Sequence, residues 1–150
     1  MNRDELQRKL RDLGHDLPPP MKPVASYIPA RKVGDFIYVS GQLPGKNGQM
    51  LVTGPVGSKV SLEDAQAACR QCVLNGLAAA IEVGEISGVL RVGGFVQCDA
   101  GYADQPKVVN GASDFLQEVF GDAGRHVRAA VGVNALPLDA SVEVEFIFTT

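Results

Sequence analysis

The residues best suited to chemistry in this 150-residue chain are an arginine and a glutamate near its end, Arg128 and Glu143. Arg128 begins an apolar run, residues 128–133, where a guanidinium without a partner would be costly. A guanidinium is a planar fork that grips a carboxylate through two hydrogen bonds, and a carboxylate nearby could orient a water molecule for attack. The pair therefore suggests a site that holds a small carboxylate beside an activated water.

Two predicted strands decide whether these residues meet. Residues 140–148 alternate strictly between an apolar set, 142, 144, 146 and 148, and a second set that includes Glu143 and Glu145. The Leu-Pro-x-Asp tip at 136–139 is a hairpin signal that joins this strand to the run 128–133. Such a hairpin would place Arg128 and Glu143 on neighbouring strands. A cross-strand ion pair would explain the same two charges without any function.

Other groups of reactive residue types have simpler explanations. Cys69 and Cys72 have CxxC spacing but lie inside a predicted helix, whereas a redox pair needs the helix N-terminus, so we interpret them as small buried residues. His15 and His126 are too far apart for a local metal motif; His126 either supports the structure or faces the site. The glycine-containing segments match no phosphate-loop or dinucleotide fingerprint, so no nucleotide cofactor is expected.

Helical and strand signals divide the first half of the chain into short elements. Residues 2–13 favour a helix capped by Asn2 and Glu5, followed by three prolines. Residues 24–30 and 35–40 predict an antiparallel hairpin, with a brief strand possible at 50–53. Ser61 can cap a long helix over 61–83 that Gly84 ends, and its inner face of mostly small residues would let it lie close to a sheet.

The second half of the chain continues in the same manner. Residues 89–98 predict a strand in which Gly93-Gly94 marks a bulge or a close backbone approach. Pro106 opens a helix that ends at about residue 120, and the closing hairpin follows. We therefore expect an α+β two-layer domain with a mixed sheet, two helices on one face and an extra N-terminal helix. The predicted division is an N-terminal helix and Pro-rich connection at 1–22 and one domain at 23–150.

Composition excludes several classes of protein. The net charge is −3, the pI is near 5.3 and only 6% of the residues are aromatic, which argues against a nucleic-acid partner. No run is long enough for a membrane span, and the first thirty residues are too charged for a signal peptide. Three cysteines without a secretory signal indicate reduced thiols and a cytosolic protein.

An ordered set of residues from Tyr27 to the C-terminus resembles the Rid family, the reactive intermediate deaminases also called YjgF-like proteins. In chain order the matching parts are Tyr27, the segment Gly34–Pro44, Asn75, Asn110, Arg128, Leu136-Pro137 and the segment Val142–Glu145. The extra N-terminal helix and the block Gly-Arg-His-x-Arg-x-Ala-Val-Gly-Val resemble the branch labelled chorismate-mutase-like or putative endoribonuclease.

The resemblance implies a chorismate-mutase-like fold assembled as a homotrimer with clefts between subunits. It implies hydrolysis of enamines and imines of the 2-aminoacrylate and 2-iminopropanoate type to 2-keto acids and ammonia. Arg128 would bind the substrate carboxylate and Glu143 would place and activate the water. The pocket would be lined by Tyr27, Ser40 and Asn110. Backbone groups near Gly41 and Ala130 would complete the lining. No metal or organic cofactor is implied.

The sequence departs from the family around this pocket. Where the family usually has Pro-Ala-Arg, this chain has His126-Val127-Arg128. Ala130 replaces the cysteine that family members commonly have two residues after the arginine. The segment before Asn110 is about four residues longer than in typical family members. Three other functions therefore stay open. The chain could be a carboxylate-binding regulatory trimer without turnover, an endoribonuclease, or a chorismate mutase, although a matching set of cationic residues for a dicarboxylate is missing.

Overall fold

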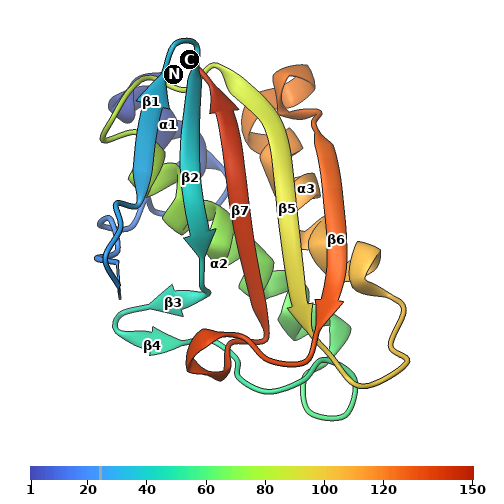
Figure 1. Ribbon diagram of the computed structural model, residues 1–150. Helices are drawn as coiled ribbons and strands as arrows, with labels where there is room; N and C mark the ends of the chain where they lie inside the picture. Colours follow the sequence, from blue (N-terminus) through green and yellow to red (C-terminus); the bar gives the residue numbers. More distant parts are fainter. Residues whose placement is uncertain (24) are drawn as a thin grey trace.

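A five-stranded mixed sheet with two long helices on one face forms the body of the molecule (Figure 1). The computed structural model describes residues 1–23 and 25–150. The helices are α1 (Arg3–Asp12), α2 (Leu62–Ala80) and α3 (Gln105–Phe120), with short 3₁₀ turns η1 (Gly121–Gly124) and η2 (Pro137–Asp139). The strands are β1 (Ala30–Val33), β2 (Phe36–Gln42), β3 (Gly45–Lys46), β4 (Gln49–Met50), β5 (Gly88–Gln97), β6 (Val127–Val133) and β7 (Val142–Thr149). The α+β class predicted from the sequence is confirmed.

The order of the strands contradicts the predicted closing hairpin. The order is β1-β2-β7-β5-β6, so β5 lies between β6 and β7. β6 runs parallel to β5 at the edge of the sheet, and β7 is antiparallel to both β5 and β2. The chain from β6 to β7 therefore crosses the end of β5 instead of turning back beside β6. The Leu-Pro-x-Asp signal corresponds to η2, a 3₁₀ turn within this crossing segment.

Contacts with the segment before α2 fix the crossing connection. Ser141 Oγ donates a hydrogen bond of 2.7 Å to the carbonyl of Gly54, and Thr53 forms an isolated β-bridge with Ala140. Gln97, at the end of β5, donates to the Ala140 carbonyl at 2.9 Å. These buried partners satisfy the polar groups of the crossing and hold β7 in the centre of the sheet.

The first hairpin exists, but its strands are displaced from the predicted ranges. β1 occupies residues 30–33, most of which were expected to be the turn, and the turn is the dipeptide Gly34-Asp35. The predicted strand 24–30 is wrong for residues 25–29, which form bends and irregular backbone, and its first residue lies outside the described part of the chain. Gly34 has a φ of 57°, a left-handed conformation that glycine adopts without strain and that suits a two-residue hairpin turn.

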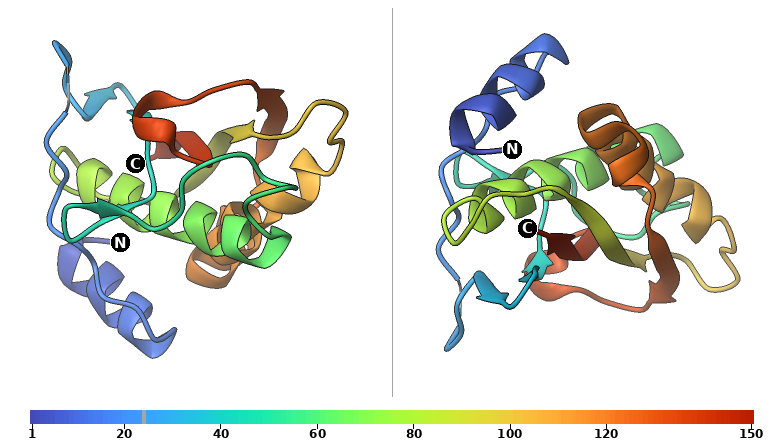
Figure 2. Two further views of the ribbon diagram at one scale, coloured as in Figure 1. Left: turned by 90° about the horizontal axis from the view of Figure 1, so that it is seen from below. Right: turned by 90° about the horizontal axis from the view of Figure 1, so that it is seen from above.

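The core lies between the sheet and α2 with α3 (Figure 2). Val142, Val144, Phe146 and Phe148 of β7 are buried, as the alternation predicts. α2 lies so close to this face that a Cβ on Gly76 would be 2.6 Å from the Phe146 ring. Cys69 and Cys72 are fully buried in α2, and burial raises the pKa of Cys69 to about 12, which confirms their interpretation as buried small residues.

Other local predictions have mixed outcomes. Ser61 caps α2 as expected, with its side chain accepting from the Asp64 amide at 3.1 Å, but α2 ends at Ala80, four residues before the glycine predicted to end it. The close backbone approach at Gly93-Gly94 is confirmed, because a Cβ on Gly94 would collide with Val109 of α3. The irregularity in the pairing of β5 with β7 lies earlier, between Val89 and Arg91.

α1 forms a third layer beyond α2 and α3 (Figure 2). The predicted capping box is present: Asn2 Oδ1 accepts from the Glu5 amide at 3.0 Å, and Glu5 Oε2 accepts from the Asn2 amide at 2.9 Å. Leu6 and Leu10 are fully buried, and the ammonium of Met1 donates to the carbonyl of Ile86 at 2.5 Å. The helix therefore packs on its own chain.

Candidate active site

Arg128 lies on the edge strand β6 and faces α3. Its partner in β5 is Val92, which in turn pairs with the core residue Phe146, so Arg128 is on the helix-covered face of the sheet. Nη1 donates to Asn110 Oδ1 at 2.8 Å, and Nη2 donates to the carbonyl of Pro106 at 3.1 Å. Among the described residues, Arg128 forms no ion pair. Its positive charge is thus oriented by neutral groups and left without a counter-ion.

A chain of hydrogen bonds extends this arrangement behind Arg128. Nη1 also donates to Ser113 Oγ at 3.1 Å, and Ser113 Oγ lies 2.9 Å from His126 Nε2. His126 Nδ1 lies 2.6 Å from the carbonyl of Gly124, which can only accept, so Nδ1 carries the hydrogen. Burial, together with the charge of Arg128, lowers the pKa of His126 and keeps the ring neutral. The Ser113 hydroxyl therefore donates to Nε2 and turns a lone pair toward Arg128.

Glu143 lies on the opposite face of the sheet. Its partner in β5 is Phe95, and its carboxylate lies against Gly41, where a Cβ would collide with Oε1. The pairing of β2 with β7 shifts between Val39 and Gln42, so the backbone at Gly41 leaves the regular ladder. Burial, followed by the negative charge of Glu145, raises the pKa of Glu143. The described residues offer it no ion-pair partner, so this carboxylate is free to act as a base.

Tyr27, Ser40 and Gly41 line one small pocket of about 50 Å³ near the end of β2. Ser40 is half-buried, and its hydroxyl donates to the carbonyl of Pro29 at 3.0 Å. Gly41 lies beside Glu143, so these residues form one group on the open face of the sheet. Asn110, Arg128 and Ala130 form a second group on the helix-covered face, because Ala130 pairs with Gly94, which contacts α3.

The seven site residues predicted from the sequence are therefore not brought together within one chain. The expectation that Arg128 and Glu143 occupy neighbouring strands is wrong, because β5 separates their strands and the side chains point to opposite faces. The cross-strand ion pair offered as an alternative is excluded for the same reason. Glu145, the second acid on this face of β7, pairs with Arg91 at 2.9 Å.

Of the two residues behind Arg128, the sequence reasoning missed Ser113 and left the role of His126 open. Ser113 was not singled out because a serine within a helix gives no signal by itself, and His126 was left between a structural role and the site. The spacing of Asn110 and Ser113 is one helical turn, which puts both on the same face of α3. That spacing, with a histidine two residues before an arginine at the start of a strand, is the signal that could have identified the group.

The sequence and structural comparisons agree on one family. The family model described as "YjgF/chorismate_mutase-like, putative endoribonuclease" matches residues 7–150. The crystal structure of the protein Atu1372, of unknown function, from Agrobacterium tumefaciens is 40% identical, with a TM-score of 0.88 over 97% of this chain and 92% of that chain. A putative endoribonuclease from Shewanella oneidensis is 30% identical, with a TM-score of 0.91 over 97% and 99% of the two chains.

A curated relative adds a named activity. The 2-iminobutanoate/2-iminopropanoate deaminase of Dermatophagoides farinae is 31% identical over 84% of this chain and 87% of its own length. The chain belongs to the YjgF/chorismate mutase-like family, in the branch described as putative endoribonuclease, and has the chorismate-mutase-like α+β fold. No helix in the described residues combines the length and apolar character needed to cross a membrane.

Proposed function

We propose that this protein hydrolyses reactive enamines and imines of small 2-imino acids to 2-keto acids and ammonia, in clefts between the subunits of a homotrimer. The observation that carries the proposal is the environment of Arg128, a cation held by three neutral acceptors and without an acidic partner among the described residues. Such a guanidinium is oriented in advance to receive a carboxylate. The named activity of the mite relative supports the same chemistry.

The chemistry requires one base and one water. With the substrate carboxylate on Arg128, water attacks the iminium carbon while Glu143 takes a proton from the water. Glu143 then returns this proton to the carbinolamine nitrogen. As the C–N bond breaks, the regenerated carboxylate takes the hydroxyl proton, which releases ammonia and leaves the 2-keto acid. The raised pKa of Glu143 suits this role, because a more basic carboxylate accepts a proton from water more readily and returns it to the leaving amine.

A second copy of the chain is needed to complete this site. Arg128 and Glu143 face away from each other in one chain, so the base that serves Arg128 must come from a neighbour. The open face of the sheet carries exposed apolar side chains, among them Val127 at 66% exposure and Val131 at 46%, and contact with another subunit would cover them. We infer that the edge of one subunit faces the Glu143 face of the next, with Tyr27, Ser40 and Gly41 lining the cleft.

Hydrolysis of freshly generated 2-aminoacrylate tests the reaction. We expect the wild-type protein to accelerate 2-keto acid formation and Arg128→Ala to lose most of that acceleration. Arg31→Ala, which removes an exposed arginine of β1, is the matched control and should behave as wild type. The proposal is wrong if the wild-type protein forms keto acid no faster than Arg128→Ala does.

Complementation tests the inter-subunit site separately. Arg128→Ala and Glu143→Gln should each be inactive, whereas trimers reassembled from an equal mixture combine an intact arginine with an intact glutamate. With random mixing, about a quarter of the clefts would regain both groups. If the mixture stays as inactive as the two variants, although both variants form mixed trimers, the site is not shared between subunits.

A carboxylate-binding module without turnover is the second candidate. It is favoured by the completeness of the Arg128 group, in which Asn110, Ser113 and Pro106 hold the guanidinium within one chain while the base lies elsewhere. Binding of a 2-keto acid measured by calorimetry, without any hydrolysis, would select this function. The net charge of −3 provides no electrostatic attraction for RNA, and cleavage of RNA by the purified protein would be needed to support the family's endoribonuclease description.

A further inference from the structure

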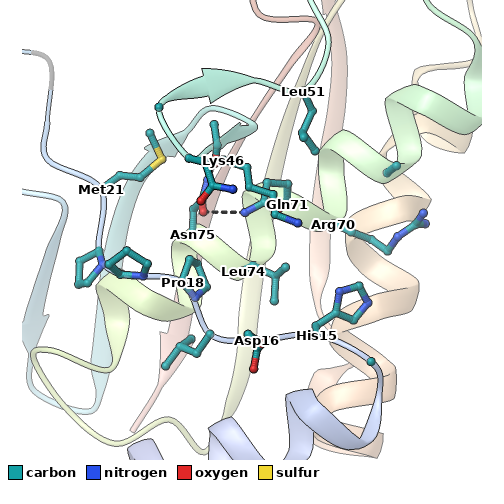
Figure 3. A pocket seen from close by; sticks show the side chains of 18 residues that line it. His15, Asp16, Pro18, Met21, Lys46, Leu51, Arg70, Gln71, Leu74 and Asn75 are labelled. Carbon is teal, nitrogen blue, oxygen red and sulfur yellow. Dashed lines mark hydrogen bonds between the residues drawn. The ribbon is translucent and has the colours of Figure 1, made fainter.

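One hollow in the molecule lies away from the residues proposed to act in hydrolysis. It has a volume of about 680 Å³, within the usual range for small-molecule sites. Three segments enclose it: residues 14–21 after α1, the turn between β3 and β4, and the outer surface of α2 (Figure 3). Its apolar walls come from residues such as Leu17, Pro18, Leu51 and Leu74. We call it the α2 pocket.

A mostly buried side-chain amide, that of Gln71, lines the α2 pocket. Gln71 is only 6% exposed, and its Nε2 donates to Asn75 Oδ1 at 3.0 Å. The orientation of both amides is fixed, because Asn75 Nδ2 donates to the carbonyls of Leu43 and Gly45 at 3.0 Å each and Oδ1 must therefore accept. The Gln71 carbonyl oxygen accepts no hydrogen bond within the described part of the chain, so it is available to a donor on a ligand in the pocket.

Positive charge lies at one end of the α2 pocket. Figure 3 shows His15 and Arg70 together at that end, with Met21 at the other end and the Gln71–Asn75 pair between them. Arg70 forms no ion pair among the described residues, and the acid at the rim, Asp16, is paired with Arg11 at 3.2 Å. An anionic group on a ligand in the pocket could pair with Arg70, which has no acidic partner among the described residues.

We propose that the α2 pocket binds a small amino or hydroxy acid with a large apolar side chain. The carboxylate would meet Arg70, the amino or hydroxyl hydrogen would donate to the Gln71 carbonyl, and the apolar side chain would lie along Leu17, Leu74 and Pro18. A large side chain is inferred because the volume of the pocket far exceeds that of a small acid. The site is distinct from the Arg128 group and does not depend on the proposed hydrolysis.

Calorimetry with L-phenylalanine and its analogues tests each part of this recognition. L-Phenylalanine and L-3-phenyllactate carry both the donor and the carboxylate, and binding by at least one of them is expected at millimolar concentrations. 3-Phenylpropanoate lacks the donor and L-phenylalaninamide lacks the carboxylate, so each should bind about tenfold more weakly or worse. Arg70→Ala should weaken the binding of L-phenylalanine or L-3-phenyllactate to a similar extent.

Ala67→Phe tests the location of the site. Ala67 is a half-buried residue of α2 that lines the pocket, so a phenyl group there would occupy part of the cavity. Glu63→Phe adds the same group to the exposed start of α2 and is the matched control. Ala67→Phe should abolish binding and keep hydrolysis, whereas Arg128→Ala should keep binding. The proposal is overturned if neither acid binds, or if binding survives in a folded Ala67→Phe protein.

Discussion

Removal of the Ser113 hydroxyl is the sharpest test of how Arg128 is positioned. Ser113→Ala deletes the acceptor 3.1 Å from Nη1 and the donor to His126, while Arg128 keeps its bonds to Asn110 and Pro106. A hydrogen bond to a charged group contributes about 1.5–3 kcal/mol. Because two of the three bonds remain, we expect the lower figure, which corresponds to about a tenfold fall in kcat/KM for hydrolysis.

The way this loss divides between kcat and KM identifies its cause. Arg128 would hold the substrate carboxylate equally in the ground state and the transition state, so a loosened guanidinium should raise KM and leave kcat nearly unchanged. Ser113→Thr restores a hydroxyl and should recover most of the activity. Ser87→Ala removes an exposed hydroxyl whose hydrogen-bond partner is Thr149 and should have no effect.

The assay is steady-state hydrolysis of freshly generated 2-aminoacrylate, with thermal unfolding of each variant as a check on folding. The reasoning is refuted if folded Ser113→Ala has the wild-type kcat/KM, or if kcat falls while KM stays constant. A loss in Ser113→Thr as large as that in Ser113→Ala would also contradict it, because the hydroxyl would then not be the group that matters.

Three further predictions concern the base, the core and the N-terminal helix. Glu143 must be ionised to accept a proton, so its raised pKa should place the acid limb of the rate profile above the ordinary glutamate value, and Glu145→Gln should move that limb to lower pH by removing a negative charge. Gly76→Ala places a Cβ 2.6 Å from the Phe146 ring and should lower the free energy of unfolding by about 1–3 kcal/mol in urea titrations. Leu6→Ala empties a fully buried position of α1 and should cost about 2–5 kcal/mol in the same assay.

Exposed positions provide the controls for these variants. Glu118→Gln removes an acid from the solvent side of α3 and should leave the pH dependence of the rate unchanged. If Glu118→Gln shifted the acid limb as much as Glu145→Gln does, the change in net charge would be responsible. Arg8→Ala on the exposed side of α1 should be nearly neutral for stability. If Leu6→Ala were equally neutral, α1 would not contribute its packing to the folded chain in solution.

Much of the local structure could be predicted because it depends on neighbouring residues. The alternation in β7 identifies its buried face, since side chains on a strand point in turn to opposite sides. The capping residues Asn2 and Ser61 identify the starts of α1 and α2, because they satisfy amide groups only a few residues away. Family membership, indicated by an ordered set of residues, is confirmed by the comparisons.

The site could not be assembled in the same way. The hairpin signal at residues 136–139 is real as a turn, but a turn does not determine which strand the chain joins next. The insertion of β5 between β6 and β7 depends on contacts among residues distant in the sequence, such as the bond of Ser141 to Gly54. An error in strand order changes every statement about which side chains meet across the sheet.

The sequence by itself therefore determined the approximate position of most helices and strands, the buried face of β7 and the residues Arg128 and Glu143 as candidates for chemistry. Only the tertiary structure decided that these two face opposite sides of the sheet, that Ser113 and His126 stand behind Arg128, and that α1 packs on its own chain. The physical reason is the distance along the chain over which each interaction acts. Caps and periodicity act within a few residues, whereas strand order and side-chain partners are set by the packing of the whole chain.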